Sequence, residues 1–159
     1  MNIQIDKREI IPLSDFELGW RFDKGHNADI LDYDKQEILA LSEIESKRLN
    51  KVIDYYEIES NRIGKYLETD WFSVNYENED KVERFRNQVE NYLKPFNEDI
   101  IISWEKKLAL KTTKKIFIKY WTDFLYPSSD DVTIISERTN WILFYNHCEA
   151  ANIWIKNKS

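Results

Sequence analysis

The chain has 159 residues, of which 42% are hydrophobic and 33% are charged, so it suits one folded domain spanning residues 1–159. This composition excludes global disorder, and no apolar run approaches the roughly 20 residues of a membrane helix, so we expect no membrane association. The net charge of −6 lies within residues 1–46, which hold eleven acidic and five basic residues. This charge disfavours nucleic acid as a partner for this region and favours a basic protein.

The N-terminal residues predict a cytoplasmic protein that begins with a short helix. The first residues lack the basic start and apolar run of a secretory signal. Residues 12–18 predict the helix, because Ser14 can cap its start and Glu17, three residues on, can reach back to the cap.

Two longer helices are predicted next. Ser42 and Glu45 repeat the capping pattern, and apolar residues then recur at helical spacing. The apolar face consists of Leu49, Val52, Ile53, Tyr56, Ile63 and Leu67. Asp80 and Glu83 open the third helix, and Pro95 ends it because proline cannot continue a helix.

From residue 99 onward, β-branched and aromatic residues form short runs that predict strands. The predicted strands are 100–105, 132–136, 141–147 and 152–155. Residues 113–125 predict one amphipathic helix instead, since their apolar residues follow a helical period. We therefore expect an α+β fold in which N-terminal helices pack on one face of a C-terminal antiparallel sheet of about four strands.

Catalytic chemistry has few candidates in this chain. Walker, GxGxxG, GxSxG and HExxH motifs are all missing, and Cys148 is the only cysteine, so we predict no catalytic residue, cofactor or metal site. One alternative remains open, a small enzyme or metal-binding domain. Strand alternation would place His147 and Glu149 on one face beside Tyr145, with Asp130 or Asp131 nearby.

Two further segments have a structural and a functional interpretation. Tyr126–Asp131 contains Pro and two Ser and predicts a turn, in which Asp130 or Asp131 accepts backbone hydrogen bonds; the adjacent carboxylates could instead bind a hard cation. Six lysines between Lys106 and Lys119 form a basic run flanked by aromatic residues. We interpret this run as a solvated face, with anion binding as a weaker alternative.

The segments Trp121–Ile134 and Trp141–Glu149 resemble the C-terminal pattern of small uncharacterised bacterial domains, YPSSDD followed by WxLxYxHxE. More loosely, the chain resembles immunity proteins of polymorphic or contact-dependent toxin systems. The resemblance implies a non-enzymatic protein that binds and neutralises a cognate toxin, for instance a nuclease. The predicted contact residues are Asp15, Glu17, Trp20, Asp23, Asp29, Asp32, Asp34, Tyr126, Ser128, Ser129, Asp130 and Asp131.

Overall fold

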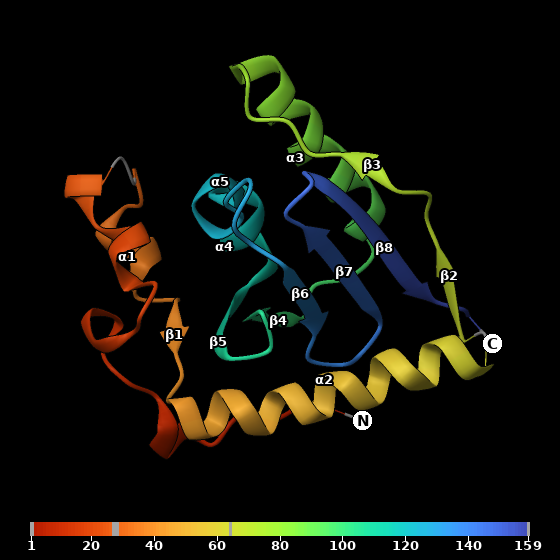
Figure 1. Cartoon of the computed structure of the whole chain (residues 1–159), viewed down its shortest axis with the longest axis horizontal. Helices are drawn as coiled ribbons and strands as arrows, with labels where there is room; N and C mark the ends of the chain where they lie inside the picture. Colours follow the sequence, from red (N-terminus) through yellow and green to blue (C-terminus); the bar gives the residue numbers. More distant parts are fainter. Residues whose placement is uncertain (1, 27–28, 64, 159) are drawn as a thin grey trace.

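A computed structural model describes residues 2–26, 29–63 and 65–158, and its centre is one antiparallel sheet (Figure 1). The strands are β1 (Leu39–Ala40), β2 (Tyr66–Glu68), β3 (Phe72–Ser73), β4 (Asp99–Trp104), β5 (Leu108–Thr113), β6 (Val132–Ser136), β7 (Trp141–Asn146) and β8 (Ala150–Lys156). Their order is β1-β5-β4-β6-β7-β8-β2, and β3 also pairs with β8. The α-helices are α1 (Asp32–Lys35), α2 (Glu43–Ile63), α3 (Glu79–Leu93), α4 (Lys114–Lys119) and α5 (Trp121–Phe124).

The α+β class is confirmed, but the prediction of about four strands is wrong, because the described residues form eight. Three of the missed strands, β1 to β3, have only two or three residues each. So short a segment cannot display the alternation by which a strand is recognised in sequence. The fourth, β5, lies within the lysine run, where Lys111 interrupts its apolar residues.

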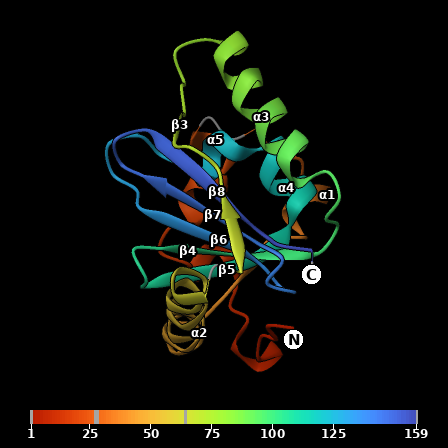
Figure 2. The same cartoon turned by 90° about the vertical axis from the view of Figure 1, so that its right-hand side faces the viewer.

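Helices cover both faces of the sheet, whereas the sequence predicted one covered face (Figure 2). On one face α2 packs Leu49 and Ile53 against Ile101, Ile135 and Ile142 of the central strands. On the other face α3, α4, α5 and the N-terminal segment enclose a larger core. We call these the α2 face and the aromatic face.

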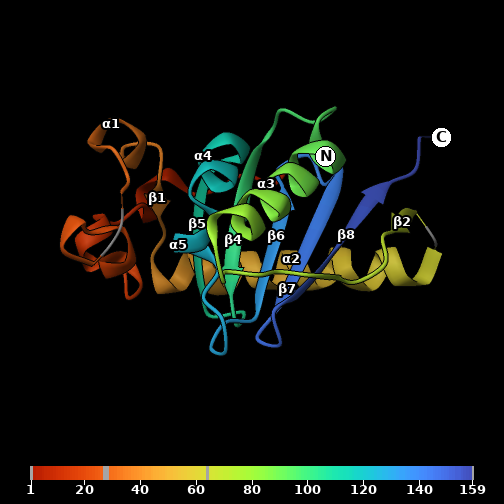
Figure 3. The same cartoon turned by 90° about the horizontal axis from the view of Figure 1, so that it is seen from above.

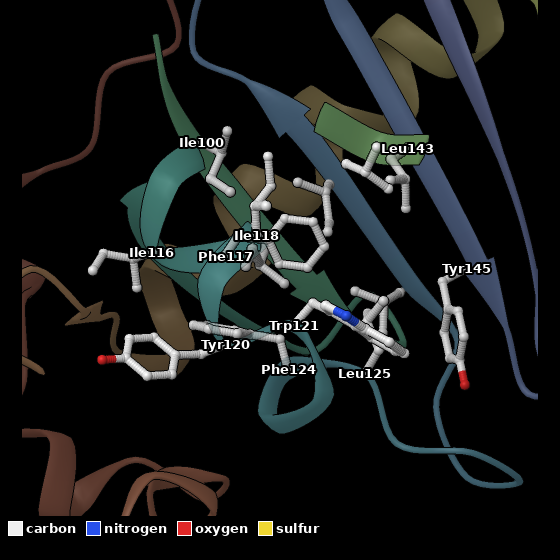
Figure 4. Packing of buried hydrophobic residues seen from close by; sticks show 14 of the residues in the cluster. Ile100, Ile116, Phe117, Ile118, Tyr120, Trp121, Phe124, Leu125, Leu143 and Tyr145 are labelled. Atoms are coloured by element: carbon white, nitrogen blue, oxygen red, sulfur yellow. The ribbon is translucent and has the colours of Figure 1, made fainter. Parts of the chain in front are cut away.

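The predicted helix 113–125 is divided into α4 and α5. Thr113 caps α4 by accepting the Ile116 N–H at 3.1 Å. Tyr120 then leaves helical geometry, with φ −117° and ψ 28°, and its hydroxyl donates to the Asp34 carboxylate. The apolar residues still point into the aromatic face, so the periodicity located the core correctly although the helix is interrupted (Figure 4).

The N-terminal segment consists of short 3-10 turns where a helix over 12–18 was predicted. These turns are Lys7–Glu9, Leu13–Asp15, Gly19–Phe22 and Lys24–His26. A Cβ at Gly19 would lie 2.0 Å from the Leu13 carbonyl oxygen, so the chain folds back more tightly there than a side chain would permit. Ser14 lies inside its turn and caps nothing, which corrects the predicted helix start.

The two longer helices begin close to their predicted starts. Ser42 Oγ accepts the Glu45 N–H at 3.2 Å, while the Glu45 carboxylate binds the Asp6 N–H and Arg48 instead of reaching back to Ser42. On the predicted apolar face, Leu67 is exposed in β2, and the side chain of Ile63 lies outside the described residues. Asn78 caps α3 by accepting the Lys81 N–H, two residues before the predicted opening at Asp80.

Candidate functional site

Three connections lie side by side where the central strands end, visible at the lower edge of Figure 3. They are the β4–β5 turn (105–107), the segment 125–131 and the β7–β8 turn (147–149). Asp131 links them, because its carbonyl accepts the Glu105 N–H at 2.9 Å and its Oδ1 accepts the His147 N–H at 3.1 Å. We call this group of three connections at the strand ends the turn edge.

A buried ion pair joins the N-terminal segment to the turn edge. Arg21 donates to both carboxylate oxygens of Asp130, at 2.6 and 3.0 Å, and both side chains are 6% exposed. Asp130 also accepts the Tyr126 N–H at 2.9 Å and the Ser129 hydroxyl at 3.2 Å, so the expected turn-forming role of this aspartate is present. This geometry positions two segments that are more than 100 residues apart in sequence.

Two aromatic rings lie above this ion pair. The Trp20 ring meets the Tyr126 ring edge-on at 5.7 Å and the His26 ring at 4.4 Å, and Trp20 is 42% exposed. The Arg21 guanidinium lies 3.9 Å from the centroid of the Tyr126 ring, a cation–π distance that holds this ring in place. Burial raises the pKa of the Tyr126 hydroxyl.

The structure thus brings together Trp20 and Tyr126, which the sequence proposed separately. We call the region formed by Trp20, Tyr126 and the exposed carboxylates around them the Trp20–Tyr126 surface.

Most of the predicted acidic contact residues are exposed. They are Asp15, Glu17, Asp23, Asp29 and Asp32, and the exposed Ser128 and Ser129 follow Tyr126. Asp23 and Asp32 each have a lysine partner, Lys35 and Lys24, at 3.5 Å. Exposed ion pairs of this length contribute little free energy. A basic group of a partner protein could therefore replace either lysine beside its aspartate with little loss of stability.

Asp34 and Asp130 do not belong to the exposed set. Asp34 is buried and accepts hydrogen bonds from Lys119, at 2.8 Å, and from Tyr120, which together lower its pKa. Asp130 is buried against Arg21. Both carboxylates therefore stabilise the fold and are not free to contact a partner. Residue type alone predicted them as contacts, because pairing with Lys119 or Arg21 depends on long-range folding.

Asp123, outside the turn edge, is a partly buried carboxyl that the sequence analysis did not single out. Burial, and secondarily the charge of Asp29, raises its pKa from 3.8 to about 6. It lines a cavity with Asp29 beside the start of α3. The sequence analysis assigned no role to this residue, because its burial depends on contacts that the local pattern does not contain.

The predicted His147 constellation is only partly assembled. His147 Nδ1 lies 3.0 Å from Asp131 Oδ1, and this contact lowers the pKa of Asp131, but the side chains are 57% and 56% exposed. β7 ends at Asn146, so His147 and Glu149 lie in a turn and not on the strand face predicted for them. Asp130 is held by Arg21, and the described residues contain no group of three His, Cys, Asp or Glu placed to hold a metal ion.

The lysine run does not form one basic face. Lys106 pairs with Asp54, Lys111 with Glu137, and Lys119 with Asp34. Lys114 donates to the carbonyls of Leu93 and Phe96, and burial lowers its pKa. The flanking rings of Trp104, Phe117 and Trp121 are buried, so they offer no stacking surface to a nucleic acid.

Within the described residues no helix is both long enough and apolar enough to cross a bilayer. No protein-family model, curated protein or solved structure matches this chain.

Proposed function

We propose that this chain is a non-enzymatic protein-binding domain that acts in the cytoplasm as an immunity protein, binding and neutralising a basic bacterial toxin. The observation that carries the proposal is the Trp20–Tyr126 aromatic pair, an exposed indole against a half-buried tyrosine ring, which the buried Arg21–Asp130 ion pair fixes in place beside exposed carboxylates of the N-terminal segment.

Exposed aromatic side chains are effective binding anchors because they bury a large area and lose little conformational entropy. The Tyr126 ring is already positioned by the Arg21 guanidinium before any partner arrives, which lowers the ordering cost of association. Leu31 and Tyr33 add exposed apolar area on the same acidic segment, next to Asp32. Aromatic anchors within carboxylates therefore suit a basic protein surface.

The carboxylates would chiefly speed association. The exposed carboxylates Asp15, Glu17 and Asp23 flank Trp20 in sequence, and Arg21 links this segment to Tyr126. Such a surface attracts a basic protein over distances of about 10 Å at physiological salt. We expect the association rate to fall by roughly tenfold between low and high salt.

The test is capture of a partner from a lysate of the source organism, with the tagged chain as bait. A captured basic protein is then purified and its affinity is measured by calorimetry. Expressed alone it should arrest growth, and co-expression with this chain should restore growth.

The decisive variant is Trp20→Ala combined with Tyr126→Ala, which should weaken binding by at least about 30-fold, as loss of interface anchors does. Tyr55→Ala is the matched control, because Tyr55 is an exposed aromatic residue on α2. Equal affinity of the double variant and the control would overturn the proposed surface. Failure to restore growth would overturn the immunity function.

A further inference from the structure

A groove of about 690 Å³ opens on the α2 face and reaches the turn edge. Its lining residues include Glu57 of α2, Trp71 between β2 and β3, and Glu105 and Asp131 of the turn edge. Glu105 also lines a smaller cavity with Arg21 and Asp130. The groove and this smaller cavity therefore share the β4–β5 turn as a wall.

The sheet register explains why this part of the α2 face stays open. One row across the strands is Ile101–Ile135–Ile142, and α2 packs on it. The neighbouring row, closer to the turn edge, is Ser103–Thr133–Phe144–Asn152, and all four residues line the groove. A floor of mixed polar and aromatic side chains in place of a second apolar row favours a ligand over further packing.

Asn152 gives the groove an unused hydrogen-bond acceptor. The residue is 1% exposed, and its Nδ2 donates to Glu68 Oε1 at 2.6 Å. Among the residues that the structure describes, its buried Oδ1 has no hydrogen-bond partner. A buried amide oxygen without a donor is costly, so this position favours a ligand that carries N–H groups.

The charges of the groove favour a cation. Four carboxylates line it, from Glu57, Glu68, Glu105 and Asp131, together with two ammonium groups, from Lys106 and Lys107. Lys106 is already engaged, since its Nζ pairs with Asp54 and with Glu57 at 3.4 Å. Burial raises the pKa of Glu57, which shows that water solvates this carboxylate poorly.

Aromatic rings complete the site. Trp71 is 52% exposed at the groove, and the Phe144 and Trp154 rings meet at 4.9 Å on its floor. Faces of aromatic rings attract cations, and a planar guanidinium can stack on them while its N–H groups point outward.

We infer that the groove binds an arginine side chain presented by a basic segment of the partner protein. This inference deepens the proposed function and rests on it. Arginine fits better than lysine because its planar fork carries five donors, which suits a site with one amide oxygen and several carboxylates.

The test uses N-acetyl-arginine methylamide as the probe, titrated into the ¹⁵N-labelled full chain and followed by NMR. We expect saturable shifts of the indole N–H signals of Trp71 and Trp154 and of the Asn152 side-chain amide. The Kd should be on the order of 1 mM, as for a ligand of this size. Absence of saturable shifts at these groups would overturn the inference.

The citrulline analogue, which has the same shape without the charge, should bind at least about tenfold more weakly. Equal binding of the citrulline or the lysine analogue would overturn the assignment to arginine. Trp71→Ala should weaken arginine binding at least about threefold, whereas Leu67→Ala, an exposed residue on the same sheet edge that does not line the groove, should leave it unchanged. Equal binding by these two variants would likewise count against the site. This titration needs no partner protein, so its failure leaves the capture experiment unaffected.

Discussion

The two faces of the sheet differ in how completely helices cover them and in the polarity of their side chains. The aromatic face carries the larger core, in which large rings such as Trp121, Phe124 and Trp141 are fully buried. The α2 face has a smaller core. Near the turn edge this core ends, and polar residues line a groove instead. The larger buried core therefore lies on the aromatic face, whereas part of the α2 face remains accessible to a ligand.

The largest expected effect tests the aromatic face. Trp121 is fully buried, with the rings of Phe85 and Tyr76 at 4.5 and 4.9 Å, so Trp121→Ala should lower the free energy of unfolding by about 4 kcal/mol. Phe144→Ala, on the half-buried groove floor, should cost about 1.5 kcal/mol. Urea unfolding measures both, and equal losses would remove the distinction between the faces.

The next effect concerns the ion pair beneath the Trp20–Tyr126 surface. Arg21→Met should lower the free energy of unfolding by about 3 kcal/mol, because it leaves the Asp130 carboxylate buried without its cation. Adding Asp130→Asn to this variant should recover part of the loss. A loss below about 1 kcal/mol for Arg21→Met would show that water reaches Asp130.

A pH dependence is expected from Asp123, which packs with the aromatic face. Its folded pKa of about 6 lies above the ordinary 3.8, so the native state binds the additional proton between these values. The resulting stability is fully present below pH 3.8 and is lost as the pH rises through about 6.

Asp123→Asn should therefore be more stable than the wild type at pH 7, by about 1 kcal/mol after allowance for partial exposure of the carboxyl. Thermal unfolding between pH 4 and pH 7 checks this result. Asp29→Asn should produce a smaller change of the same sign, because Asn there removes only the secondary cause. An unchanged pH profile in Asp123→Asn would refute the burial of this group.

The smallest expected effect sharpens the assignment of the groove. Asn152→Leu loses the hydrogen bond to Glu68 but also removes an unpartnered buried oxygen, so the free energy of unfolding should change by less than about 0.5 kcal/mol. The same variant should lose binding of the arginine probe. A loss of more than about 2 kcal/mol would instead make Asn152 a structural residue.

Hydrophobic pattern alone located much of the fold. The long runs became β4, β6, β7 and β8, and helical periodicity found α2 and α3 within a residue or two of their starts. The failures have local causes. The strands β1 to β3 are too short to alternate, Gly19 tightens the N-terminal segment, and Tyr120 leaves the helix to bind Asp34.

The candidate site was less predictable because its contacts are long-range. Trp20 and Tyr126 were both proposed from their residue types, yet only the Arg21–Asp130 pair brings them together. The groove gave no sequence signal, since its floor residues come from four separate strands and depend on the register between them.

The strand order also governs when the chain can fold during synthesis. The edge strands β1, β2 and β3 come from residues before 75, whereas the centre of the sheet comes from residue 99 onward (Figure 1). As the chain leaves the ribosome, α2 therefore emerges with Leu49 and Ile53 facing strands that have not yet been made. Pairings so distant in sequence form slowly, so we expect the apolar face of α2 to stay uncovered, and open to aggregation, until the C-terminal half has been made.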